Sequence, residues 1–244
     1  MRKGVEVAGE THTKEKRVTA LVPMKGHSER VPNKNLRPFC NRPLCHWTIL
    51  NLQKSRYVKD IVVNTDSQEI AENIRQNFDR VKIIDRPNEI RGDFVSMNVI
   101  IAYDLSQLAG EHFLQTHSTN PLLNTETIDE GIDLYFHNLG MYDSLFAVTR
   151  HNARFYRSDG SPINHDPQEM LRTQDLPPIL EENSNLYIFS KESFKQSGNR
   201  RIGLRPYLFE INKLEAIDID EEEDFLLAEL LCQAKLNKLR GSRL

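Results

Sequence analysis

The chain has 244 residues, ordinary proportions of apolar and charged side chains, and a formal net charge of −3. This length is sufficient for one domain with a substantial buried core. The slightly negative charge argues against a general binder of nucleic acids or other polyanions, so any phosphate binding must be local.

Cysteine usage and hydropathy favour a cytoplasmic protein. Cys40, Cys45 and Cys232 form no zinc-finger pattern, and their odd number suits a reducing compartment. The chain has no apolar run of about 18 residues and no signal-peptide core, so we expect neither membrane insertion nor secretion. The polar residues 1–17 are expected to form a mobile leader, and residues 18–244 a single domain.

The first predicted strand begins at Val18 and runs into Pro23, which stops the ladder because proline lacks a donor. A mainly basic loop follows, up to Arg42. In this loop Gly26 allows close backbone approach, Ser28 adds a hydroxyl, and successive amides can form a nest for phosphate oxygens. The loop therefore predicts an anion site, and the alternative is a solvated basic turn.

Apolar periodicity predicts alternating strands and helices after this loop. The first strand after the loop ends in Thr65, Asp66 and Ser67. In open α/β sheets ligands bind beyond the carboxyl ends of strands. The alternative is that Asp66 or Ser67 caps the following helix. Helices are expected at 44–54, 68–78, 95–108 and 127–139, and strands at 60–67, 81–84, 113–115 and 144–148.

An irregular stretch at 149–178 interrupts this pattern and is expected to protrude from the domain. The chain re-enters the core as a strand at 185–189. Near the end, apolar and acidic residues alternate, which places Asp218 and Asp220 on one face of a predicted strand. Two neighbouring carboxylates suit Mg²⁺ bound to phosphate oxygens. The alternative is a solvated strand face before the last helix, at 225–239.

The basic loop resembles the signature loop of the sugar-acid cytidylyltransferases, the acylneuraminate cytidylyltransferase family, where a strand runs into x-P-A-R-x-G-S-K-R-x-P-x-K-N. Lys25 stands where this family usually has an arginine, and so offers a point charge in place of a bidentate fork. The resemblance implies that Lys25, Arg30 and Lys34 neutralise phosphate oxygens during catalysis. The residues implied to bind the nucleotide in this loop are Pro23, Lys25, Ser28, Lys34 and Asn35.

Further motifs resemble the family in the same order along the chain. The family motif V-S-T-D-S matches around Asp66, and R-P-x-x-L-x-x-D matches at Arg86 and Asp93, which implies nucleotide contacts for Asp66, Arg86 and Ser96. For Arg86 the alternative is a surface salt bridge. The glutamine of L-L-Q-P-T-S-P-L falls on His117, implied to bind the nucleotide.

Two matches concern the acceptor and the metal. Gln115 stands two residues before His117, and Asn183 matches the asparagine of R-P-N-G, so both are implied to bind the acceptor. Glu181 replaces the arginine of that motif, which leaves sialic acid itself open as the acceptor. The motif S-I-D-I-D-x-x-x-D implies that Asp218 and Asp220 hold Mg²⁺.

The elements favour an α/β fold with a doubly wound, mostly parallel sheet. The resemblance implies a Rossmann-like nucleotidyltransferase of the GT-A type, in which the excursion at 149–178 helps to form a homodimer. It implies a Mg²⁺-dependent cytidylyltransferase that couples CTP to a nonulosonic, sialic-acid-like sugar acid and releases pyrophosphate, in cell-surface polysaccharide biosynthesis. The alternatives are a nucleotidyltransferase for a sugar phosphate or another small alcohol, and a non-catalytic nucleotide-binding protein.

Overall fold

The computed structural model describes residues 16–241, with side chains through residue 238. Most of the predicted leader, residues 1–15, lies outside the described residues. Lys16 forms an ion pair with Asp133 on helix α4 (Thr125–His137). None of the described helices has the length and apolar character that crossing a bilayer requires.

The described residues contain a seven-stranded sheet in the order β5-β4-β1-β6-β8-β7-β9. Four of its six neighbouring pairs are parallel, and only β8 runs antiparallel to both neighbours. The prediction of a mostly parallel α/β sheet is therefore confirmed. The strands are β1 (Val18–Leu21), β4 (Val58–Thr65), β5 (Val81–Asp85), β6 (His112–Gln115), β7 (Ser144–His151), β8 (Ile179–Ser190) and β9 (Pro206–Glu210).

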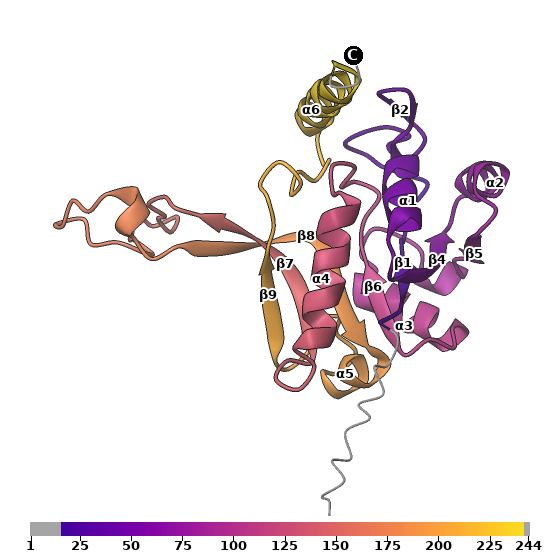
Figure 1. Cartoon of the computed structure of the whole chain (residues 1–244), viewed down its shortest axis with the longest axis horizontal. Coiled ribbons are helices and arrows are strands. Elements are labelled where there is room, and N and C mark those ends of the chain that lie inside the picture. Colours follow the sequence, from indigo (N-terminus) through magenta and orange to yellow (C-terminus); the bar gives the residue numbers. More distant parts are fainter. Residues whose placement is uncertain (1–15, 242–244) are drawn as a thin grey trace, which may run out of the picture.

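Helices cover both faces of the sheet (Figure 1). Successive strand residues point to opposite faces, and in β1 Ala20 packs into one core while Leu21 packs into the other. The first core includes residues of α1 (Leu44–Lys54), α2 (Gln68–Asn77) and α4. The second includes residues of α3 (Met97–Gln107) and α5 (Lys191–Gln196). The sheet is thus wound on both sides.

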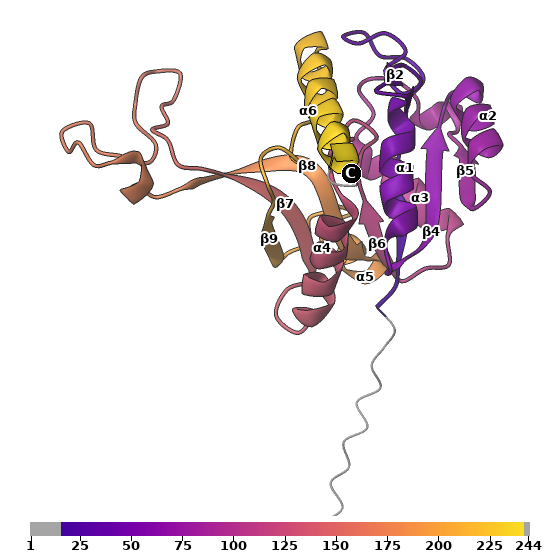
Figure 2. The same ribbon diagram turned by 45° about the horizontal axis from the view of Figure 1, so that its top comes forward.

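A third apolar cluster joins the two ends of the domain. The short strands β2 (Pro38–Phe39) and β3 (Arg42–Pro43) form a hairpin within the basic loop, and α6 (Glu222–Gly241) lies beside it and α1 (Figures 1 and 2). Phe39, Ile219 and Phe225 are buried together in this cluster. Their burial brings the acidic segment before α6 next to the basic loop after β1.

Several predicted boundaries are wrong. The stretch predicted as irregular at 149–178 begins within β7, and β8 begins at Ile179, so Glu181 and Asn183 lie inside a strand. The predicted strand through Asp218 and Asp220 does not form, because its backbone turns at 213–215 and Ile219 donates to Thr119 outside the sheet. The elements α5, β9 and the β2–β3 hairpin were not predicted.

The segment between β7 and β8 forms an arm that projects from the sheet (Figure 1). It contains a single 3₁₀ turn, Thr173–Asp175, and an isolated bridge between Tyr156 and Pro162. Large apolar side chains on the arm are exposed, including Ile163 and Met170. The arm thus carries exposed apolar side chains at a distance from the core.

Candidate active site

A cavity of about 530 Å³ opens where the loops after β1, β5 and β6 meet residues that precede α6. It therefore lies at the carboxyl ends of parallel strands, where open α/β sheets bind ligands. The structure brings many of the predicted site residues together here. Those lining the cavity are Pro23, Lys25, Ser28, Arg30, Lys34, Asn35, Arg86, His117, Asp218 and Asp220.

The basic loop is fixed to the start of α6 by ion pairs. The guanidinium of Arg30 lies 3.0 Å from Asp220 and 2.9 Å from Glu221, and Lys34 donates to the carbonyl of Ile219. These carboxylates hold the pKa of Arg30 above its usual value. The contacts place the cations of the loop opposite the acid pair, an arrangement suited to a metal-bound polyphosphate.

Asp66 shapes the loop from below the cavity. Its Oδ1 accepts from the Gly26 amide at 2.7 Å. Ser67 caps α2, which confirms the capping alternative for that residue. A Cβ at Gly26 would lie 2.7 Å from the Ser67 Cβ, so only glycine fits this approach. Asp66 does not line the cavity and acts on the loop backbone.

Arg86 is buried beneath the loop, with a side chain only 4% exposed, so the surface salt-bridge alternative is wrong. Its guanidinium donates to the carbonyls of Met24 and Asn64 and to the Asn64 side chain at 2.8 to 3.1 Å. Asn64 in turn donates to the buried carboxylate of Asp104 at 2.6 Å. Arg86 therefore fixes the backbone at the start of the basic loop while one edge of it faces the cavity.

Burial gives Asp104 a pH-dependent effect on stability. Desolvation raises its pKa from 3.8 to about 6, against the opposing effects of Asn64 and Arg86. A carboxyl whose folded pKa is raised stabilises the fold below its unfolded pKa, and loses that contribution as the pH rises through the folded pKa. Relative to Asp104→Asn, the wild type should lose up to about 3 kcal/mol of unfolding free energy between pH 4 and pH 7. Urea titrations across this range test the prediction, and a constant difference would contradict it.

His117 and Gln115 lie together at the end of β6. The Gln115 Nε2 is 3.0 Å from the His117 Nε2, and Gln115 itself is buried and does not line the cavity. Burial and the charge of Arg201 lower the pKa of His117 to about 4. His117 is therefore neutral at physiological pH and able to take part in hydrogen bonding without adding charge.

Asp218 and Asp220 face the same cavity from an extended segment outside the sheet. Burial and the neighbouring Asp220 raise the pKa of Asp218, and its Oδ1 is buried without a hydrogen-bond partner. Asp224 accepts from the amides of Asp220 and Glu221, which fixes this segment. Among residues 16–241 no cluster of three or more His, Cys, Asp or Glu side chains could hold a metal ion. The unpartnered Asp218 oxygen beside a second carboxylate nevertheless fits a hard divalent cation with its other ligands from substrate and water.

Two further predicted site residues, Ser96 and Asn183, lie outside the cavity lining, as does Glu181. Ser96 caps α3 by accepting from the Asn98 amide, and Asn183 is buried, where it donates to the Thr149 hydroxyl. Glu181 pairs with His151 at 2.7 Å near the base of the arm. The segment that resembles R-P-N-G therefore contributes Ser184, which lines the cavity, in place of Asn183.

Two charged residues that line the cavity were not predicted as site residues. They are Arg201 and Asp93, and Asp93 pairs with Lys25. Asp93 was visible as a motif match, but its ion pair with Lys25 joins loops that are distant in sequence. Arg201 lies between α5 and β9 in a run without a recognisable motif. Only the fold shows that this arginine lines the same cavity as His117.

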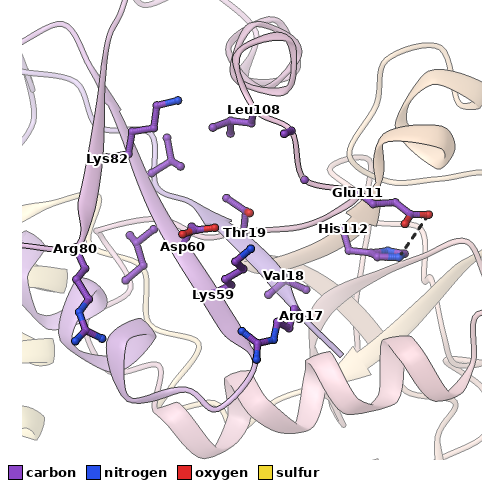
Figure 3. Close-up of a pocket in the computed structure, with 14 residues that line it drawn as sticks. Arg17, Val18, Thr19, Lys59, Asp60, Arg80, Lys82, Leu108, Glu111 and His112 are labelled. Atoms are coloured by element: carbon purple, nitrogen blue, oxygen red, sulfur yellow. Dashed lines mark ion pairs between the residues drawn. The ribbon is translucent and has the colours of Figure 1, made fainter. Parts of the chain in front are cut away.

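Another cavity, of about 440 Å³, lies at the amino ends of β1, β4 and β6 (Figure 3). Arg17, Lys59, Arg80 and Lys82 line it together with acidic and apolar residues. In Figure 3 the ends of Arg80 and Lys82 point away from one another, so these two charges do not converge on one position. The cavity at the carboxyl ends is therefore the stronger candidate for chemistry.

Comparisons with known proteins identify the family. A family model described as cytidylyltransferase matches residues 19–240. N-acylneuraminate cytidylyltransferase A of Danio rerio is 28% identical over 224 residues, covering 88% of this chain and 51% of that protein. Pseudaminic acid cytidylyltransferase of Campylobacter jejuni is 21% identical over 224 residues, covering 86% of this chain and 94% of that protein. The chain thus spans about half of the first relative and almost all of the second.

Solved structures share the fold. CMP:2-keto-3-deoxy-manno-octonic acid synthetase complexed with CTP has a TM-score of 0.62 at 12% identity, covering 93% of this chain and 100% of that chain. The 4-diphosphocytidyl-2C-methyl-D-erythritol synthase of Anaerococcus prevotii also has a TM-score of 0.62, at 10% identity, covering 89% of this chain and 99% of that chain. The fold agrees with the motifs and with the family match, and the chain belongs to the cytidylyltransferase family.

Proposed function

We propose that this protein transfers CMP from CTP to the anomeric hydroxyl of a nonulosonic sugar acid. The hydroxyl oxygen forms a bond to the α-phosphorus, the bond from that phosphorus to the bridging oxygen breaks, pyrophosphate leaves, and the hydroxyl loses its proton. The observation that carries the proposal is the single cavity in which Lys25, Arg30 and Lys34 face Asp218 and Asp220. Relatives named for acylneuraminate and pseudaminic acid support a sugar acid as acceptor.

The chain's own residues position the triphosphate. Lys25, Arg30 and Lys34 each have a carboxylate partner, and these ion pairs hold the cations at the cavity wall before a nucleotide arrives. At Lys25 and Arg30, phosphate oxygens can exchange with the carboxylates because exposed ion pairs contribute little stability. Asn35 donates to the carbonyl of Lys25 at 2.9 Å and accepts from Ser118, which supports the loop conformation. Phosphoryl transfer of this kind depends mainly on positioning and charge neutralisation.

Mg²⁺ is the metal that this proposal implies, and Asp218 and Asp220 would hold it. When bound, the ion neutralises charge on the phosphate oxygens. Lys34 lies 3.4 Å from Asp220, with a side chain that is 11% exposed, and so keeps that carboxylate oriented toward the cavity. The buried Oδ1 of Asp218 has no competing partner, which leaves that oxygen available to a cation.

Pyrophosphate release tests the activity. The purified chain with Mg²⁺ and each of CTP, UTP, ATP and GTP is incubated with acylneuraminate, pseudaminic acid, 2-keto-3-deoxy-manno-octonic acid and a sugar phosphate. The proposal expects pyrophosphate with CTP and a sugar acid only. Preference for the phosphorylated acceptor would establish the alternative nucleotidyltransferase, and no release with any acceptor would contradict the proposal.

We also infer that the arm joins two copies of the chain. Its support is the exposed apolar surface that includes Tyr156, 54% exposed, and Met170, 83% exposed, at a distance from the core. Burial of such a surface against a second copy would be favourable. Sedimentation equilibrium should give the mass of two chains, and Met170→Asp should shift it toward one. A wild-type mass of one chain at micromolar concentration would contradict this inference.

A further inference from the structure

We propose that Arg201 is the residue that recognises the carboxylate of the acceptor, and so makes the site specific for sugar acids. This inference rests on the proposed function and assigns one end of the same cavity. Arg201 enters from the segment between α5 and β9 and lines the cavity together with His117 and Ser184.

The first support is a difference among the cationic side chains of the cavity. Lys25 pairs with Asp93, Arg30 and Lys34 pair with Asp220, and Arg86 lies 3.8 Å from Asp66. Among the described residues, no carboxylate oxygen lies within 4.0 Å of the Arg201 guanidinium. Arg201 is thus a cavity cation whose direct partners are all neutral.

The second support is that Arg201 is fixed and partly desolvated. Its Nη1 donates to the Gln115 Oε1 at 2.7 Å, its Nη2 donates to the Tyr187 hydroxyl at 3.2 Å, and its guanidinium lies 3.8 Å from the centre of the Tyr187 ring. Burial lowers the pKa of Arg201. A partly buried guanidinium held by neutral groups favours an anion, because a bound carboxylate compensates for the lost hydration and matches the planar donors.

The third support is the place of Arg201 relative to the acid pair. Arg201, His117 and Asp220 line the same cavity, and Gln115, which accepts from Arg201 at 2.7 Å, also lies 3.0 Å from the His117 Nε2. In a 2-keto sugar acid the carboxylate is bonded to the anomeric carbon that carries the attacking hydroxyl. A carboxylate held by Arg201 therefore keeps that hydroxyl near His117 and directed toward the nucleotide side of the cavity.

This assignment also accounts for Glu181. A basic residue at that position would suit a sugar carboxylate, but Glu181 points to His151 and does not line the cavity. Arg201 supplies the missing positive charge from a different part of the chain. Its partner Tyr187 donates in turn to Glu182, the neighbour of Glu181 on β8.

The test compares wild type with Arg201→Met, Arg201→Lys and the control Arg205→Met, whose exposed side chain lies outside the cavity. Calorimetric titration measures binding of acylneuraminate, pseudaminic acid and 2-keto-3-deoxy-manno-octonic acid, and of the methyl ester of each. Turnover is followed by pyrophosphate release. Arg201→Met should raise Kd and KM for the accepted acid about 100-fold, with KM for CTP within about twofold of wild type. Arg201→Lys should recover part of the loss, and Arg205→Met should show none.

The esters separate recognition from folding. Wild type should bind the acid about 100-fold more tightly than its ester, and Arg201→Met should bind the two alike. If Arg201→Met melts far below wild type, two other measurements test the assignment. They are the ratio of acid to ester affinity in wild type and the acid affinity of Arg201→Lys. A wild type that accepts acid and ester equally, an unchanged KM in a folded Arg201→Met, or no binding of any acid would overturn the assignment. Acid binding that depends on Arg201 without turnover would instead overturn the proposed function alone.

Discussion

Replacing Asp218 by asparagine should lower kcat for CMP-sugar formation about 100- to 1,000-fold, the cost typical of losing one group that stabilises charge in a transition state. Asp218 has a buried oxygen without a partner in the cavity, and an asparagine there offers one oxygen and no charge. The melting temperature should not fall, because the substitution removes a carboxylate whose charged form burial disfavours. Pyrophosphate release and a thermal melt measure the two quantities.

Mg²⁺ titration of the same variant identifies the reason for the loss. Wild type in the presence of CTP should melt at a higher temperature as Mg²⁺ is added, and Asp218→Asn should lose most of this shift. Asp79→Asn is the matched control, because Asp79 is exposed between α2 and β5 and lies outside the active-site cavity. Equal Mg²⁺ responses in wild type and Asp218→Asn would remove Asp218 from the metal site.

Replacing Arg86 by methionine should destabilise the fold by about 3 to 5 kcal/mol, the usual cost of removing one partner from a buried charge network. Arg86 is buried and donates to Met24 and Asn64, and its charge lies near Asp104. The variant removes the donor to the Asn64 side-chain oxygen and to the Met24 carbonyl, and of the two cations that lower the pKa of Asp104 it leaves only Lys82. Urea unfolding at pH 7 measures the loss, and Arg75→Met, an exposed change on α2, should stay near wild type.

A double variant tests whether the buried carboxylate causes part of that loss. Adding Asp104→Asn to Arg86→Met should cost less than the sum of the two single changes, since the unpaired charge is then absent. Strict additivity would mean that Arg86 acts on the loop carbonyls alone. A fall of under about 1 kcal/mol in Arg86→Met would show that the site tolerates loss of the network.

The sequence determined the alternation of strands and helices because apolar periodicity is a local property. The run from Val18 places alternate residues in the two cores, and α1 has the predicted bounds, Leu44–Lys54. The motifs after β1 and before α6 were also readable, because each requires particular side chains within a few residues. Those motifs led to the family that the comparisons show.

Local sequence patterns did not predict the short helix α5 or the edge strand β9. Helix α5 has six residues, too few for a helical period to repeat. Strand β9 is an edge strand in which only Phe209 is buried. The alternation around Asp218 resembles a strand, yet Ile219 is buried between α6 and the β2–β3 hairpin and its segment pairs with no strand. A period of two shows which residues share a side of an extended chain, and it does not show whether a neighbouring strand is available.

The tertiary structure alone decided which charged side chains share a cavity. Arg30 and Glu221 are 191 positions apart and become an ion pair because Phe39, Ile219 and Phe225 bury one another and draw the two segments together. Long-range contacts likewise bring Arg201 near His117, because Gln115 accepts from Arg201 and lies 3.0 Å from the His117 Nε2. The sequence thus determined which chemical groups the protein carries, and the packing of distant apolar residues determined which of them meet. Electrostatic interactions act over a few ångströms, whatever the separation along the chain.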